Sequence, residues 1–124
     1  MNLDDGESAI VESKDICRIA TLSRNGWPHV VPVAYVFLDG TFYIPARPDS
    51  KKIRNLRANP NATLVIDDEA TERGVMVECA STILEGADAR PMREYMSRER
   101  GWQNTESTLV IKLHPLRKSS WFLR

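Results

Sequence analysis

The sequence predicts a mainly β protein, a small antiparallel barrel with short helices. Seven short segments carry the apolar or alternating side chains that are typical of strands. Two hairpin dipeptides, Asn25-Gly26 and Asp39-Gly40, separate three of these segments, and both favour the positive φ angles of a tight turn. Only two or three helices fit between the strands, which is too few for a parallel α/β sheet.

Length and charge limit the organisation further. The 124 residues fit a single domain, which we expect to span 1–124, with a helix over about 5–15 and a barrel over 16–123. The 17 basic residues equal the 17 acidic ones, so we expect no nucleic-acid partner. No apolar run approaches the roughly 18–20 residues of a membrane helix, and the acidic start does not resemble a signal peptide. We therefore expect a cytoplasmic protein without a membrane partner.

The first half of the chain contains the clearest strand pattern. Strands are expected over 17–22, 28–38 and 41–44, joined as a three-strand meander by the two hairpin turns. The segment 28–38 is apolar on both faces, whereas a small barrel buries one face only. The second face must meet a helix or another chain. We favour a homodimer interface, because the helices available as cover are short.

A helix is expected over 51–58, with Ser50 as its N-cap and with Ile53 and Leu56 on its buried face. Asn59-Pro60 ends this helix, because the residue before proline avoids the helical conformation. Strands over 62–67 and 75–83 follow, separated by an acidic loop.

A third helix is expected over 88–100, with Asp88 as its N-cap and Gly101 beyond its end. Two closing strands, 109–113 and 119–123, are expected on either side of His114-Pro115. The segment 86–108 is expected to shape the mouth of a pocket. The arginines of this segment either meet an acidic substrate or form a solvated helix face. We favour the solvated face. The arginines concerned are Arg90, Arg93, Arg98 and Arg100.

Familiar catalytic patterns are missing from the sequence. Two histidines, His29 and His114, give no triad signature, and no zinc-type pair or glycine-rich phosphate loop occurs. No metal site is therefore expected. Cys17 and Cys79 are expected to be buried and reduced. If the protein is an enzyme, a bound cofactor supplies its chemistry.

The most informative segment is 47–57, which carries basic side chains at the start of a helix. Helix N–H groups, the Ser50 hydroxyl and the amines of Lys51 and Lys52 together suit a phosphate group. A solvated basic helix face is the alternative, and local chemistry alone favours that alternative.

The order of motifs along the chain resembles the pyridoxamine 5′-phosphate oxidase-like family of FMN-binding split barrels. The resemblance covers roughly 16–123, and it depends on the order and spacing of these segments: 18–22, 25–33, 39–44, 50–56, 59–65, 73–78 and 119–122. It implies a six- or seven-stranded antiparallel split β-barrel, a homodimer, and FMN or the deazaflavin coenzyme F-420 at the dimer interface.

The resemblance also assigns roles to individual residues. Lys52, with Lys51 and Ser50, would bind the cofactor phosphate, and Pro45, Ala46 and Arg47 would flank it. Trp121 would pack near the ring from the neighbouring subunit or else join the core. The strand residues along the ring and ribityl chain would be His29, Val30, Val31, Pro32 and Val33.

Some positions depart from the family pattern. Cys79 stands where many relatives have glycine, the strand 30–33 lacks the basic residues of true pyridoxamine phosphate oxidases, and their C-terminal substrate segment is missing. These differences argue against vitamin B6 oxidation. The expected function is a flavin- or deazaflavin-dependent oxidoreductase acting on a small organic substrate, with no catalytic side chain assigned. The alternatives are a non-catalytic cofactor- or haem-binding module and a barrel dimer with an empty pocket.

Overall fold

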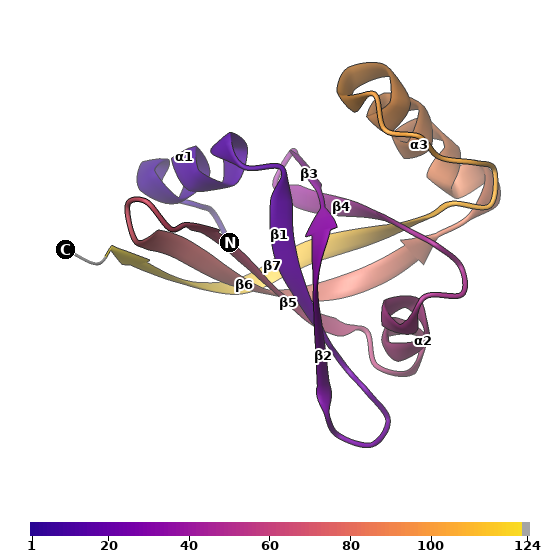
Figure 1. Cartoon of the computed structure of the whole chain (residues 1–124), viewed down its shortest axis with the longest axis horizontal. Helices are drawn as coiled ribbons and strands as arrows, with labels where there is room; N and C mark the ends of the chain where they lie inside the picture. The colour runs from indigo at the N-terminus through magenta and orange to yellow at the C-terminus, as the bar shows by residue number, and fades with distance from the viewer. Residues whose placement is uncertain (123–124) are drawn as a thin grey trace.

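Residues 1–122 are described by the computed structural model, which contains three helices around one strongly curled antiparallel sheet (Figure 1). The seven strands lie in the order β2-β1-β5-β6-β7-β4-β3 and form a half-barrel. The mainly β class and the seven antiparallel strands are confirmed. The elements are α1 (Asp5–Ser13), β1 (Ile16–Leu22), β2 (Pro28–Ala34), β3 (Val36–Leu38), β4 (Thr41–Ala46), α2 (Lys51–Ala58), β5 (Asn61–Asp68), β6 (Arg73–Leu84), α3 (Gly86–Arg100) and β7 (Leu109–Phe122).

The expected strand 28–38 is divided at Tyr35, so the prediction of one continuous strand was wrong. β2 pairs with β1, whereas β3 pairs with β4 at the opposite edge of the sheet. The backbone N–H of Tyr35 donates to the carbonyl of Asp15 at 3.0 Å instead of to a strand partner, and its hydroxyl donates to the carbonyl of Val11. The sequence does not indicate this break, because the alternation of inward- and outward-facing side chains continues while the pairing partner changes from β1 to β4.

The two expected C-terminal strands are one. β7 runs from Leu109 to Phe122 along β6, and the expectation of separate strands around His114-Pro115 was wrong. Pro115 lies opposite Cys79 while Arg117 lies opposite Glu78, so Leu116 is the extra residue of a β-bulge. A bulge accommodates a proline inside a long strand because the ladder is locally interrupted there. The expected strand end at Leu123 lies outside the described residues.

The helices begin and end close to their expected limits. α1 is capped by Asp4, whose carboxylate accepts from the N–H of Glu7, and it ends at Ser13 rather than at residue 15. α3 begins at Gly86 with Glu85 as N-cap, so Asp88 is not the cap but belongs to the first turn. Gly101 ends α3 in the left-handed conformation at φ 68°, as expected.

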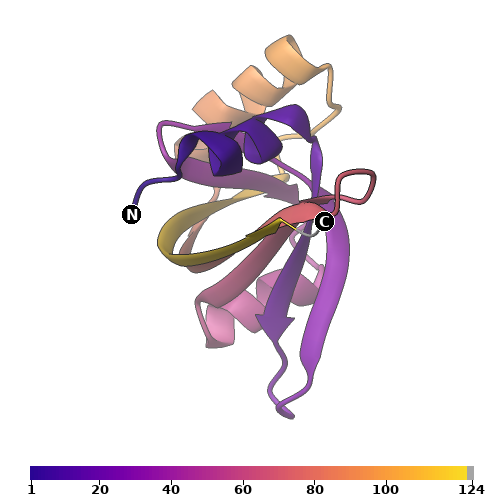
Figure 2. The ribbon, with the colours of Figure 1, turned by 90° about the vertical axis from the view of Figure 1, so that its left-hand side faces the viewer.

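The interior of the half-barrel is filled by side chains from both ends of the chain. Ile10 and Val11 of α1 and Ile53 and Leu56 of α2 pack into the same buried cluster as the inward-facing strand residues. In Figures 1 and 2, α1 and α3 lie at the top of the curled sheet, whereas α2 lies lower, close to the projecting β1–β2 hairpin. Within residues 1–122, no helix is both long and apolar enough to span a membrane.

Candidate functional site

Helix α2 is held against the barrel by apolar packing and by polar contacts of Asn55. Ile53 and Leu56 are buried, three residues apart on the face that meets the core. Beside them, the side-chain amide of Asn55 donates to the hydroxyl of Thr21 on β1 at 3.0 Å. The helix therefore presents Lys51 and Lys52 from a fixed position next to β1.

Ser50 occupies the expected N-cap position but does not cap the helix with its side chain. Its hydroxyl donates to the carbonyl of Arg47 at 2.8 Å and closes the turn before α2. The N-cap position is therefore confirmed, although the Ser50 side chain makes no capping bond. As a result, no side chain within residues 1–122 accepts from the first N–H groups of α2, and such groups suit an anion.

Lys52 is half-buried at the start of α2. Burial and the neighbouring charge of Arg47 lower its pKa below the ordinary value for lysine. No carboxylate forms an ion pair with Lys52 in the part of the chain that the structure describes. Arg47 is largely exposed and lies 3.5 Å from a carboxylate oxygen of Asp49. Two neighbouring cations, one partly desolvated and without a counter-ion, favour an anionic group between them.

The predicted ring-binding strand, 29–33, is the edge strand β2. His29, Val31 and Val33 face inward and pair with inward-facing residues of β1, whereas Val30 and Pro32 face outward and are exposed. His29 lies opposite Thr21, the residue that anchors α2. Its Nδ1 atom is buried and has no hydrogen-bond partner among the described residues. A buried nitrogen without a partner is costly, so it marks a position where a ligand would be stabilised.

Pro45 and Ala46 end β4, where they pair with Val110 and Leu109 of β7. The Ala46 side chain is buried in the core and Pro45 has no N–H group, so neither side chain offers a polar contact. Their contribution is to direct the loop that carries Arg47 toward the start of α2.

Trp121 lies apart from these residues within one chain. Its ring packs over Gly74, where an added Cβ would lie 2.3 Å from Trp121 Cζ2. This end of the β6–β7 pair is at the left of Figure 1, whereas α2 is at the lower right. The structure brings together α2, Arg47 and the start of β2, but it does not bring Trp121 to them.

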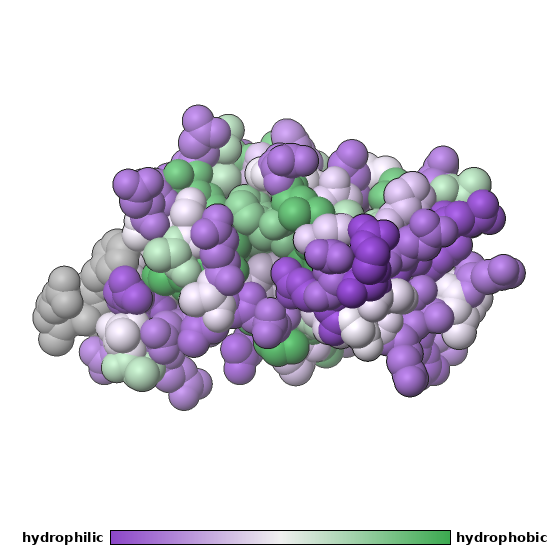
Figure 3. Space-filling view, turned by 90° about the horizontal axis from the view of Figure 1, so that it is seen from above, coloured by the Kyte–Doolittle hydropathy of each residue, from purple (hydrophilic) through white to green (hydrophobic). Residues whose placement is uncertain are grey.

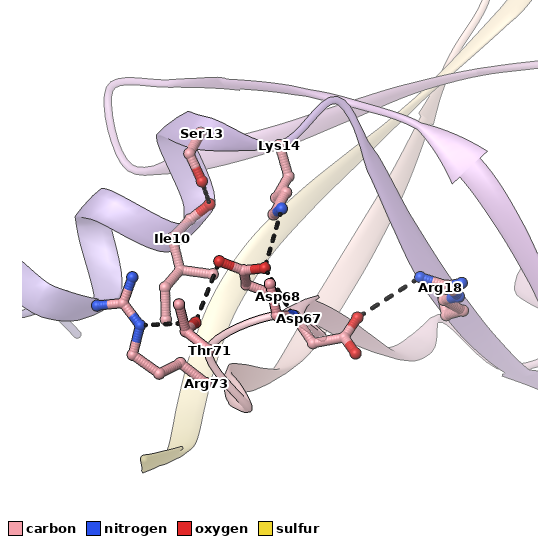
Figure 4. A network of polar contacts seen from close by, with 9 residues as sticks. Ile10, Ser13, Lys14, Arg18, Asp67, Asp68, Thr71 and Arg73 are labelled. Atoms are coloured by element: carbon pink, nitrogen blue, oxygen red, sulfur yellow. Dashed lines mark hydrogen bonds and ion pairs between the residues drawn. The ribbon is translucent and has the colours of Figure 1, made fainter. Parts of the chain in front are cut away.

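Residues at the opposite end of the sheet form a polar network that has no role in this site. Lys14 pairs with Asp68 and Arg18 pairs with Asp67, each at 3.5 Å, and the Thr71 hydroxyl donates to Asp68 (Figure 4). That hydrogen bond, with the nearby Lys14, lowers the pKa of Asp68. The network attaches the end of α1 to the loop between β5 and β6.

The arginines of α3 differ in their surroundings. The surface over α3 is strongly hydrophilic (Figure 3), and Arg90 and Arg98 are exposed as expected. Arg93 is only 6% exposed and donates to the carbonyl of Thr108 at 3.3 Å, so its assignment to a solvated face was wrong. Arg100 pairs with Asp15 at 3.2 Å.

Two surface depressions lie beside α2 or the loop that precedes it. One, of about 700 Å³, lies between Arg47 and the loop after α3, which contributes Trp102, Asn104 and Thr108. The other, of about 610 Å³, lies between the β1–β2 turn and α2. Both join segments that are distant in the sequence, and the expected contribution of 86–108 to a pocket was the only signal for the first.

The cysteines are buried and free, as expected, and burial raises the pKa of Cys17 and of Cys79 to about 12. Among residues 1–122, no three side chains of the metal-binding types gather at one point. The site therefore consists of cations, helix N–H groups and one imidazole.

Solved structures with the same fold carry several different descriptions. An F-420 reductase is 18% identical, with 94% of this chain and 98% of that chain covered and a TM-score of 0.79. A pyridoxamine 5′-phosphate oxidase-related, FMN-binding protein from Nostoc punctiforme PCC 73102 is 15% identical, with coverage of 97% and 86% and a TM-score of 0.76. HutZ, the haem storage protein from Vibrio cholerae, is 15% identical, with coverage of 98% and 95% and a TM-score of 0.74.

No curated protein matches the sequence. The family model described as pyridoxamine 5′-phosphate oxidase matches residues 3–122, which is nearly the whole chain. The half-barrel with its edge strand β2 and the basic start of α2 agrees with the motif order on which the resemblance was based. The chain therefore belongs to the pyridoxamine 5′-phosphate oxidase family.

Proposed function

We propose that the chain binds FMN through the start of α2 and the strand β2, and exchanges electrons with a small organic substrate as a homodimer. The observation that carries the proposal is Lys52, a half-buried ammonium beside Arg47 with no carboxylate partner in the described part of the chain. A cofactor phosphate supplies the missing negative charge. The N–H groups at the start of α2, which have no side-chain acceptor among the described residues, add hydrogen bonds to the same group.

The flavin ring would lie along β2. His29 offers a buried Nδ1 that has no partner in the part of the chain that the structure describes, and the edge position of β2 leaves backbone groups of 29–33 available to a ligand. When bound, the flavin supplies the electron-transfer chemistry. The chain binds the phosphate, orients the ring and excludes water from one of its sides. No side chain is assigned as a general acid or base.

The outer face of β1 and β2 suits an interface between two copies of the chain. Ile16, Leu22 and Val30 lie on this face, Val30 is 57% exposed, and no helix covers them. In contrast, Val36 and Leu38, farther along the same segment, pack with α3. A second copy on the uncovered part would shield these apolar side chains.

The proposal also specifies which cofactor is bound. FMN fits a single phosphate near Lys52, and F-420 is the alternative because it also carries a phosphate group. Solved structures of this fold described as an FMN-binding protein and as an F-420 reductase support both choices.

Haem binding without turnover is the second candidate function. His29 favours it, because an imidazole nitrogen without a hydrogen-bond partner suits an iron ligand. A haem storage protein with the same fold supports this reading. His114 is a weaker ligand candidate, because it is exposed on β7 and lies opposite Ala80.

A visible absorption spectrum, recorded on the purified protein and during titrations with FMN, F-420 and haem, separates these functions. A flavin or deazaflavin spectrum that shifts on saturable binding supports the proposal. A Soret band that depends on His29 supports the second candidate. A protein that binds none of the three contradicts both.

A further inference from the structure

An open groove of about 610 Å³ lies between the β1–β2 turn and α2. The hairpin and the helix lie on the same side of the sheet in both ribbon views (Figures 1 and 2). The volume of the groove is within the range of small-molecule binding sites. The groove is lined by Ser23, Arg24, Asn25, Lys51, Arg54, Asn55 and Arg57.

The lining contains four cationic side chains and no acidic one, although the whole chain has equal numbers of each charge. Arg57 is paired with Glu85 at 2.7 Å, and Arg54 donates to the carbonyl of Asp49 at 2.8 Å. Arg24 and Lys51 form no ion pair within residues 1–122. At least two positive charges therefore face the groove without a counter-ion.

The groove also contains two polar side chains that are more than nine-tenths buried. Ser23 is 8% exposed and Asn55 is 6% exposed. The Asn55 amide donates toward the Ser23 hydroxyl oxygen at 3.4 Å, which leaves the Ser23 hydroxyl hydrogen for another acceptor. No acceptor for that hydrogen is present in the described part of the chain. A buried hydroxyl donor in a groove lined by cations suits an anionic oxygen.

Lys51 and Lys52 face different surroundings. Lys51 lines this groove, whereas Lys52 does not and is half-buried beside Arg47. The two lysines were expected to share one phosphate. Neighbouring residues on a helix point about 100° apart, so each can serve a separate anion.

We infer that this groove is a second anion site, which binds the diphosphate group of a small molecule through Arg24, Lys51 and Arg54. The inference goes beyond the proposed flavin site, because it uses neither Lys52 nor β2. Two or more cations without counter-ions favour a ligand with at least two negative charges over a single carboxylate. The source of the diphosphate is either a free inorganic ion or a nucleoside diphosphate.

Calorimetric titration with inorganic pyrophosphate at low ionic strength tests the inference. We expect saturable binding of one pyrophosphate per chain, and about a tenfold to hundredfold loss of affinity in the double variant Arg24→Gln/Arg54→Gln. Both side chains are exposed, so the variant is expected to fold, and circular dichroism checks this. The matched control is Arg90→Gln/Arg98→Gln on α3, which should bind pyrophosphate like the unmodified protein.

A parallel titration with adenosine diphosphate distinguishes the two sources. Equal or tighter binding that is lost in the same double variant identifies a nucleotide, whereas binding of pyrophosphate alone identifies the free ion. Absence of saturable pyrophosphate binding, or equal affinity in the double variant, overturns the inference.

The variant Lys52→Ala separates this site from the flavin site. It should retain pyrophosphate binding even where FMN binding is weakened, and loss of pyrophosphate binding in Lys52→Ala would show a single shared site and overturn the inference. A protein that binds pyrophosphate but no flavin would contradict the proposed function alone.

Discussion

The side-chain amide of Asn55 on α2 donates a hydrogen bond of 3.0 Å to the hydroxyl of Thr21 on β1, and both residues are buried. Thr21 is also the strand partner of His29. This contact joins the helix that carries Lys51 and Lys52 to β1, whose neighbour β2 carries His29, the candidate ring contact. The buried polar pair therefore helps to fix α2 relative to β2, together with the burial of Ile53 and Leu56.

Replacing Asn55 with alanine should lower the free energy of unfolding by about 1–3 kcal/mol, because the substitution removes the bond and leaves the buried Thr21 hydroxyl without its donor. Urea denaturation measures this change. The control Asn61→Ala removes an exposed side chain at the start of β5 and should stay within about 0.5 kcal/mol of the unmodified protein. Equal stabilities of the two variants would contradict the structural role of Asn55.

Gly74→Ala should displace the ring of Trp121. A Cβ at this position would lie 2.3 Å from Trp121 Cζ2, which is too close for any carbon contact. We expect a cost of about 1–3 kcal/mol from overpacking and a change in tryptophan fluorescence. The same glycine substitution in a Trp121→Leu background should cost less. An unchanged emission spectrum in Gly74→Ala would show that the ring does not lie over residue 74.

The hairpin turns and helix α2 are predictable from the sequence because they depend on local signals. Asp39 and Gly40 both adopt the positive φ angles of a two-residue turn. At Asn25-Gly26 only Gly26 does, and the turn spans 23–27, so the position of this turn was predicted but the two-residue geometry was wrong. Helix α2 has its apolar residues three apart and a proline after its end. The basic start of this helix is also a local signal, but the assignment of Lys52 to a phosphate came from the family resemblance, because local chemistry alone favours a solvated face. These features need no knowledge of distant contacts.

The break at Tyr35, the bulge at Leu116 and the burial of Arg93 could not be read from the sequence. Each depends on a partner far along the chain: Asp15 for Tyr35, β6 for the bulge, and Thr108 for Arg93. The basic groove was missed for the same reason. Arg24 belongs to a hairpin turn, and only the fold places it beside α2.

The free energy of unfolding should depend on pH through Glu7. Burial alone would raise the pKa of this carboxyl, but hydrogen bonds from Lys118 and from the backbone of Asp4 outweigh it and lower the pKa below 4.5. A carboxyl with a lowered folded-state pKa contributes stability above its unfolded-state pKa, and this contribution is lost as the pH falls through the folded-state value.

Glu7→Gln should therefore reduce stability at neutral pH and show a smaller further loss on acidification below about pH 4.5. Denaturation midpoints measured across that range test this expectation. The matched control, Glu12→Gln, changes an exposed carboxyl of the same helix and should leave the pH profile unaltered. Parallel profiles for the unmodified protein and Glu7→Gln would contradict the assignment.

Val30→Asp should convert the proposed homodimer to a monomer. The side chain is 57% exposed on the outer face of β2, so the monomer has room for the carboxylate, whereas an apolar interface would have to bury it. Sedimentation velocity measures the change. Ala9→Asp, at an exposed position on α1, is the control and should leave the mass unchanged. A mass that is the same with and without Val30→Asp would exclude this face as the interface.

The central claim is that Lys52 holds the cofactor phosphate, and the dissociation constant of FMN in Lys52→Ala tests it most directly. Loss of a charge-assisted hydrogen bond costs about 1.5–3 kcal/mol, so the affinity should fall about tenfold to hundredfold. Lys52→Arg, which keeps the charge, should retain most of the affinity. An FMN affinity in Lys52→Ala equal to that of the unmodified protein would contradict the claim.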